Sequence, residues 1–149
     1  MAYLNRIKIQ NLLKEFRERT NVICSSLITA DGFLIALDQV SLPEDDDHHE
    51  SLGAICRGIV DLVHHGIQLF PNAKPVKQIS IKAGNQMNID GFEIVLTSLI
   101  NDIIFAVMFP NTLNLGVILF ELNNTIQKLS KYFQEVDQDE IIEQISVLV

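Results

Sequence analysis

The chain has 149 residues and a mass of 16.8 kDa, which is the size of one domain. With 48% hydrophobic and 20% charged residues it is too apolar to be intrinsically disordered, and it needs no metal or disulfide to build a core. The net charge of −8 and the isoelectric point near 4.8 argue against a general nucleic-acid binder, because phosphate binding requires clustered cations.

The sequence shows no membrane span and no secretion signal. The longest uninterrupted apolar run, from Ile103 to Phe109, is far shorter than the roughly 20 residues that cross a bilayer. The N-terminal segment has a mixed basic pattern without the apolar core of a signal peptide. Two cysteines, Cys24 and Cys56, do not make a disulfide framework. We therefore expect a reduced, cytoplasmic protein.

The N-terminal third predicts a helix followed by a β-hairpin. Hydrophobic periodicity indicates a helix over residues 5–20, whose buried stripe is Ile9, Leu12, Leu13 and Phe16. Its other face is basic; we interpret it as a solvated surface, with an acidic partner or a membrane surface as alternatives. Strands are predicted over 22–29 and 33–37, because the intervening Asp31-Gly32 favours a hairpin turn.

A long helix is predicted after an acidic loop at 44–50, ending near Phe70 because Pro71 follows. Its expected buried stripe is Leu52, Ile55, Cys56, Ile59, Val63, Ile67 and Phe70. Its far face carries Ala54, Arg57, Gly58, Asp61, His65 and Gln68. A glycine inside a helix costs about 1 kcal/mol relative to alanine. The small residues Ala54 and Gly58 therefore predict close packing against the helix of a second copy, unless they fit under a loop.

The C-terminal half predicts three strands, over 76–83, 91–97 and 103–109, and a helix from about Asn114 or Leu115 to Phe133. The stripe of this helix is Leu115, Ile118, Leu122, Ile126, Leu129 and Phe133. In the extension 134–149, Asp139 is a suitable cap for a short amphipathic helix. The order α-β-β-α-β-β-β-α plus a short helix predicts an α+β fold. Its hairpins imply a five-stranded antiparallel sheet, with helices on both faces.

No motif for catalysis or cofactor binding is present. Gly53 and Gly58 have the glycine spacing of a phosphate loop, but Ile59 stands where the lysine is required. The acids and histidines of 45–50 lack metal-ligand spacing, so we interpret them as charges that favour a helix N-terminus. Asp61 and His65 lie one turn apart without a third ligand, which is typical of a surface pair. Cys24 is interpreted as a small buried hydrophobe. No cofactor and no metal are expected.

Three stretches resemble the roadblock / dynein light chain family. They are residues 12–16 (LLKEF), 27–36 (LITADGFLIA) and 106–116 (AVMFPNTLNLG), continuing to Leu122. The resemblance covers about residues 4–133 and implies a roadblock-type, profilin-like domain over 1–133. It also implies a homodimer in which the strand 76–83 pairs with its copy across a two-fold axis, beside the paired long helices. The implied dimer interface is Ala54, Gly58, Asp61, Val76, Gln78, Ser80 and Lys82.

The resemblance implies a non-enzymatic regulator or scaffold that binds a small Ras-like GTPase. Polarity regulators of this family activate their GTPase without inserting an arginine finger, by reshaping its own catalytic loops. The expected partner-binding residues are Arg57, His64, His65 and Gln68, with Asp61 nearby and the acidic loop as a charged rim. One alternative is a light-chain-like assembly subunit without a GTPase role, docking through 134–149. Another is an enzyme or ligand sensor, which would require a deep polar pocket.

Overall fold

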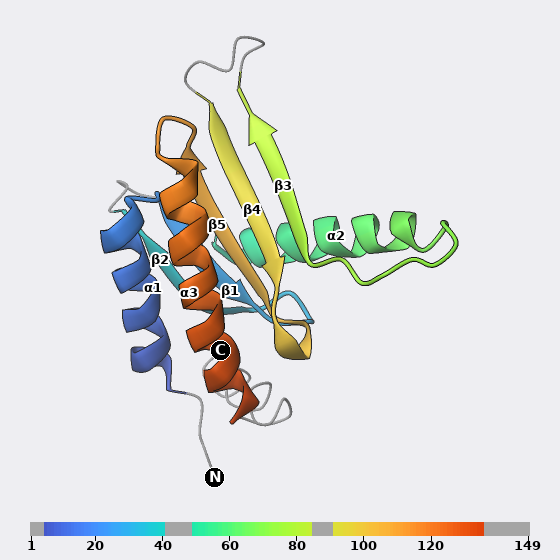
Figure 1. Ribbon diagram of the computed structural model, residues 1–149. Helices are drawn as coiled ribbons and strands as arrows, with labels where there is room; N and C mark the ends of the chain where they lie inside the picture. Colours follow the sequence, from blue (N-terminus) through green and yellow to red (C-terminus); the bar gives the residue numbers. More distant parts are fainter. Residues whose placement is uncertain (1–4, 41–48, 85–90, 136–149) are drawn as a thin grey trace.

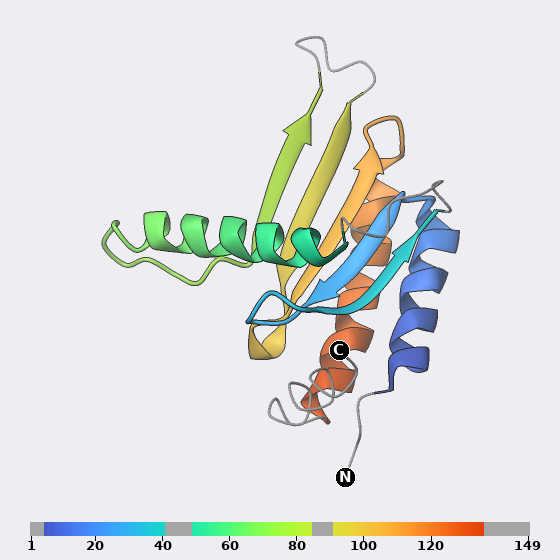
Figure 2. The ribbon, with the colours of Figure 1, turned by 180° about the vertical axis from the view of Figure 1, so that it is seen from behind.

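A five-stranded antiparallel sheet, in the order β2-β1-β5-β4-β3, organises the chain. The computed structural model describes residues 5–40, 49–84 and 91–135, without the side chains of 49–52. Helices α1 (Arg6–Thr20) and α3 (Leu115–Gln134) lie side by side on one face of the sheet, and α2 (His49–Ile67) crosses the other (Figures 1 and 2). The predicted α+β fold is confirmed, including helices on both faces.

The strand bounds agree closely with the predicted ones. The strands are β1 (Cys24–Ile28), β2 (Leu34–Gln39), β3 (Gln78–Ala83), β4 (Phe92–Ser98) and β5 (Ile104–Pro110). The strand expected over 76–83 begins only at Gln78, so Val76 precedes it. A short 3₁₀ helix, η2 (Ile100–Asp102), joins β4 to β5 and was not predicted. The acidic loop up to residue 48 and the expected short helix in the tail lie outside the described residues.

The larger core lies between the sheet and the pair α1 and α3. The predicted stripes supply it: Ile9, Leu13 and Phe16 from α1 and Ile118, Leu122, Leu129 and Phe133 from α3 are buried. The Phe16 ring packs edge-on against Phe105 of β5, with ring centroids 5.6 Å apart. Leu12 and Ile126 of the predicted stripes are partly buried against this core. Leu115 is exposed, because it lies in the first turn of α3, next to the N-cap Asn114. The Arg17 Nε donates to Asp38 at 2.6 Å and ties α1 to β2.

The rotation of α2 about its axis differs from the predicted one. Cys56 is buried as expected, but Gly53 and Val60 join it under the sheet, whereas Ile55 and Phe70 are 59% and 70% exposed. The helix also ends at Ile67 rather than near Phe70. Because α2 is apolar on several sides, periodicity alone does not select the side that is buried. A steric contact selects it. Gly53 lies against the Gly32 turn, where a Cβ would come within 2.2 Å of the Gly32 carbonyl oxygen.

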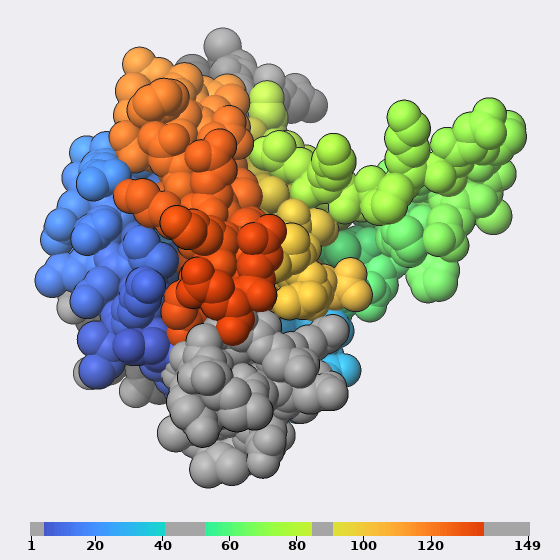
Figure 3. All heavy atoms as spheres, turned by 60° about the horizontal axis from the view of Figure 1, so that its bottom comes forward, coloured from blue at the N-terminus to red at the C-terminus, as the bar shows by residue number. Residues whose placement is uncertain are grey.

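Only the first part of α2 packs on the sheet. Val60 is its last buried residue, and none of residues 61–70 is buried. We call this segment, residues 61–70, the α2 arm. It projects beyond the edge strand β3 and stands away from the body of the molecule (Figures 2 and 3). A helix that extends past its own sheet leaves apolar side chains without cover, and such a surface is typical of a protein interface.

Replacing Gly53 by alanine is expected to lower the free energy of unfolding by about 1–3 kcal/mol, because the new methyl group overlaps a backbone oxygen. Gly66 of the same helix is the matched control: a Cβ there meets no atom within 4 Å. Gly66→Ala is therefore expected to be neutral or to stabilise by up to about 1 kcal/mol. Urea unfolding at one protein concentration measures both. Equal effects of the two substitutions would contradict the close approach at Gly53.

Candidate functional site

The edge strand β3 presents backbone groups that no described part of the chain bonds. The Ser98 amide donates to the Lys77 carbonyl at 2.8 Å, and the register with β4 continues without a break to Ala83. Because hydrogen bonding alternates along an antiparallel pair, Ile79 and Ile81 bond to β4. The backbone groups of Gln78, Ser80 and Lys82 then point away from β4, in the direction of solvent. Such an edge is a template for a further strand.

The far face of α2 is accessible where it was predicted to be. Ala54, Gly58 and Asp61 are exposed, and a Cβ at Gly58 would meet no atom within 4 Å. Gly58 therefore has no packing role within the described part of a single chain. Gln78, Ser80 and Lys82 of β3 are exposed as well, and Val76 is half-buried. The edge strand and the α2 face thus carry the predicted dimer residues on an uncovered surface.

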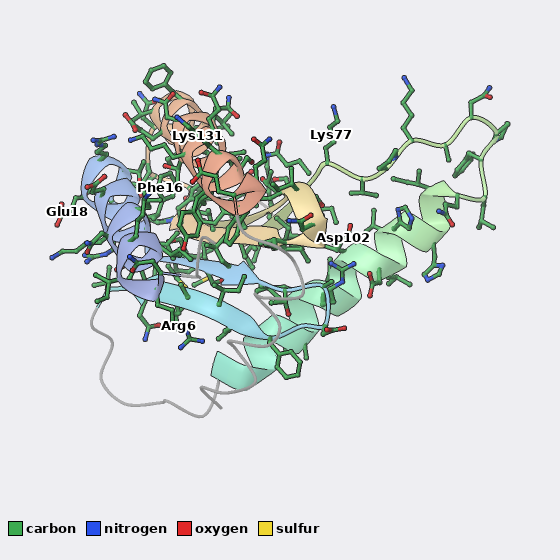
Figure 4. All side chains as sticks on the ribbon, turned by 90° about the horizontal axis from the view of Figure 1, so that it is seen from below. Arg6, Phe16, Glu18, Lys77, Asp102 and Lys131 are labelled. Carbon is green, nitrogen blue, oxygen red and sulfur yellow. The ribbon has the colours of Figure 1, made fainter. Side chains whose placement is uncertain are left out.

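Three of the predicted partner-binding residues, Arg57, His64 and Gln68, lie in two side-chain pairs whose members are four residues apart. The Arg57 guanidinium lies 2.9 Å from the Asp61 carboxylate and donates to the Asp102 carbonyl of η2 at 3.0 Å. Figure 4 shows Asp102 beside α2, at the turn between β4 and β5. The Gln68 amide nitrogen lies 2.8 Å from His64 Nε2. Arg57 is therefore held against the body of the molecule, while His64, His65 and Gln68 lie on the α2 arm.

Sequence reasoning missed the apolar part of this surface. Leu62, Leu69 and Phe70 of the α2 arm are 75%, 85% and 70% exposed. Leu62 follows Gly58 by one helical turn, so the two share a face. The signal was present in the sequence, because the helix is apolar on more than one side. Phe70 was predicted to be buried beneath the sheet, which is wrong, and Leu62 and Leu69 were assigned to neither face. Periodicity does not show where a helix leaves the surface it packs on.

The site has the composition of an interaction surface. Within residues 5–40, 49–84 and 91–135, no group of three His, Cys, Asp or Glu side chains is placed to hold a metal ion. Two hollows lined by described residues lie along α3, and their linings include none of these side chains. None of the described helices is long and apolar enough to cross a membrane. What this surface offers is backbone hydrogen bonding, apolar side chains and a few fixed polar groups, which is what binding another protein requires.

Both cysteines carry raised pKa values. Burial, followed by the negative charges of Asp38 and Cys56, raises the pKa of the Cys24 thiol from 9.0 to about 11, and burial also raises the pKa of Cys56. The folded chain then keeps the Cys24 proton at a pH where an unfolded thiol has lost it. We therefore expect the free energy of unfolding to decrease as the pH rises from about 9 to about 11.

Urea unfolding at about pH 8 and about pH 10 measures this decrease, and Cys24→Ala is expected to remove part of it. An unchanged pH dependence in the variant would contradict the assignment to Cys24. The same raised pKa predicts slow reaction of Cys24 with thiol reagents at neutral pH, since the thiolate is the nucleophile.

Comparison with known proteins gives a structural match only. No protein-family model and no curated protein matches the chain. The MglB structure from Myxococcus xanthus is similar with a TM-score of 0.77 at 17% identity, covering 93% of this chain and 96% of that one. The gliding protein MglB from Thermus thermophilus gives 0.72 at 14% identity, covering 91% and 96%. A Roadblock/LC7 domain from Streptomyces avermitilis gives 0.70 at 14%, covering 89% and 99%. The chain therefore has the roadblock fold.

Proposed function

We propose that the chain is a homodimeric, non-enzymatic, cytoplasmic regulator that binds a small Ras-like GTPase. The observation that carries the proposal is the uncovered surface formed by the β3 edge and the α2 arm. It combines unused backbone groups with large apolar side chains that no described part of the same chain covers. The roadblock fold supports the proposal, because the resemblance to the roadblock family is what implies a GTPase partner. Residues 1–133 would form the roadblock-type domain and 134–149 an extension.

In the proposed dimer, β3 pairs with its copy in antiparallel orientation across a two-fold axis. With Ser80 at the axis, Gln78 of one protomer lies opposite Lys82 of its partner, so the same three residues supply both halves of the contact. The α2 helices would meet at Ala54, Gly58 and Asp61, and Leu62 would be buried between them. Pairing removes an unprotected strand edge and an exposed apolar surface in one step.

The polar residues of α2 would then form the docking surface for the GTPase. His64, His65 and Gln68 lie on the α2 arm, and Arg57 lies closer to the sheet. The Arg57 guanidinium is already bound to the Asp102 carbonyl and the Asp61 carboxylate. This arrangement favours docking over insertion of an arginine into the active site of the partner. It agrees with activation through the partner's own catalytic loops.

The proposal is tested by measuring binding to each small Ras-like GTPase of the source organism, loaded with GDP or with a non-hydrolysable GTP analogue. We expect one GTPase to bind with a preference for one nucleotide state, and its hydrolysis rate to change. The double variant His64→Ala with Gln68→Ala is expected to weaken binding at least about 10-fold, by the loss of polar contacts. Lys14→Ala, an exposed change on α1, is the control. Failure to bind any of these GTPases in either state would refute the proposal.

An assembly subunit without a GTPase role is the second candidate. It is favoured by another apolar patch at the start of α3, on the sheet face opposite α2, formed by Leu115, Val117, Leu119 and Phe120, the last 65% exposed. A protein with two apolar surfaces on opposite faces is suited to joining two partners. Phe120→Ser would then abolish assembly with a second protein and leave the dimer intact, whereas the regulator alone predicts no such loss.

A further inference from the structure

A groove with a basic lining runs between the first turns of α1 and the last turns of α3. It has a volume of about 270 Å³ and is lined by Lys8, Leu12, Lys128, Lys131, Tyr132 and Glu135. A second hollow, lined by Asn124, Gln127, Lys128 and Lys131, continues it along α3. Figure 3 shows the two helices side by side, and Figure 4 shows Lys131 on the last turns of α3, with α1 beside it.

The walls of the groove are fixed by contacts between the two helices. The Asn5 amide, at the N-cap of α1, donates to the Tyr132 hydroxyl. The Lys8 ammonium lies over the Tyr132 ring, 5.2 Å from its centroid. Leu12 is half-buried and packs against the larger core. The groove therefore has an apolar floor of Leu12 and Tyr132, with lysine ammonium groups at its rim.

This face is positive on an acidic protein. Helices α1 and α3 together hold seven of the 11 Lys and Arg residues but only three of the 19 Asp and Glu residues. The carboxylates of Asp38 and Glu121 pair with Arg17 and Arg19. Among the described residues, no ion pair joins a carboxylate to Lys8, Lys128 or Lys131. The groove therefore favours a negatively charged segment that also has apolar side chains.

The sequence of this chain contains such a segment directly after α3. Residues 136–149 carry Asp137, Asp139, Glu140 and Glu143 and no lysine or arginine, together with Ile141, Ile142, Ile145 and Leu148. The segment starts one residue after Glu135, which itself lines the groove. Fourteen residues span about 21 Å even as a helix, enough to follow the last three turns of α3. Covalent attachment gives the segment a high effective concentration at the groove.

We propose that residues 136–149 dock onto the α1–α3 groove of their own chain. Their carboxylates would pair with Lys8, Lys128 and Lys131, and their isoleucines would cover the half-buried Leu12 beside the buried Tyr132 ring. Salt would weaken this docking, because its ion pairs would lie near the surface. The docking is independent of the proposed dimer and GTPase contacts, because the groove lies on the sheet face opposite α2.

A zero-length carbodiimide cross-linker, which joins a carboxylate to an amine only in direct contact, tests this on the full chain. We expect links from Asp137, Asp139, Glu140 or Glu143 to Lys8, Lys128 or Lys131, at several times the yield of links to the exposed Lys14. High salt should reduce them. Mixing unlabelled and nitrogen-isotope-labelled protein separates links within one chain from links between chains. The variant Ile141→Asn with Ile145→Asn keeps every carboxylate and amine, and is expected to lower the yield at least about fivefold.

Three results would overturn the proposal. Links found only between differently labelled chains would place the segment on a second copy. Links to Lys14 at the same yield would show an unbound tail that reacts at random. A third result is the absence of links to the groove lysines. If these lysines are then protected from amine-reactive reagents only when vesicles of anionic lipid are added, the groove binds a membrane surface instead.

Discussion

Replacing Leu62 by serine is expected to raise the dissociation constant of the dimer by a factor of roughly 10² to 10⁴. Leu62 is 75% exposed on a single chain and lies one turn after Gly58, on the α2 face that is proposed to meet its copy. Full burial of a leucine side chain contributes about 1.5–3 kcal/mol. Two-fold symmetry places two copies of the side chain in the interface, so the loss is about 3–6 kcal/mol.

Ile7→Ser is the matched control for this experiment. Ile7 is also 75% exposed, but it lies on α1, away from the proposed interface. Sedimentation equilibrium or light scattering across a range of concentrations gives the dissociation constants, and circular dichroism verifies that the variants fold. If both variants dimerise like the wild type, or if the wild type is a monomer throughout, the proposed α2 contact is wrong.

Replacing Ser80 by proline is expected to weaken the dimer roughly 10- to 100-fold while leaving the sheet of each protomer intact. The alternation set by the Ser98–Lys77 bond places the Ser80 amide on the free side of β3. Proline removes that donor and places its ring in the path of a second strand, and it is tolerated on edge strands. Loss of one backbone hydrogen bond per protomer, with the added crowding, amounts to about 1.5–3 kcal/mol.

Ser80→Ala separates this effect from the loss of the side chain. The Ser80 hydroxyl donates to a Glu93 carboxylate oxygen at 2.6 Å, and both substitutions remove that bond. Only proline removes the backbone donor. We therefore expect the alanine variant to dimerise like the wild type. Equal weakening by alanine and proline would assign the effect to the Glu93 contact and contradict strand pairing at this edge.

The two variants together distinguish the parts of the proposed interface. A dimer held by β3 alone would lose affinity with Ser80→Pro and tolerate Leu62→Ser. A dimer held by α2 alone would show the reverse. Neither result depends on the identity of the GTPase, so the dimer can be established before its partner is known. Until these measurements are made, the dimer interface stays a prediction for Gln78, Ser80 and Lys82 of β3 and for Ala54 and Gly58 of α2.

The sequence by itself determined the elements and the layers. Each of these features has one structural interpretation: the stripes of α1 and α3 have a single buried face, and Asp31-Gly32 is a hairpin turn. The apolar strand β5 fits only a position that is covered on both faces. Local propensity and burial therefore agree, and the α+β sheet with helices on both faces follows from them. The accessible face of α2 was predicted for the same reason, since its polar and small residues are spaced one turn apart.

Only the tertiary structure decided how α2 sits and where it stops packing. Its sequence is apolar on several sides, so hydrophobicity leaves its rotation open. The close approach of Gly53 in α2 to the Gly32 carbonyl in the β1–β2 turn fixes that rotation, and these two residues are 21 positions apart in the sequence. The exposure of Leu62 and Phe70 depends on the position of the β3 edge, which no local pattern encodes. Burial is a property of the surface that a helix meets, and that surface exists only once the sheet has formed.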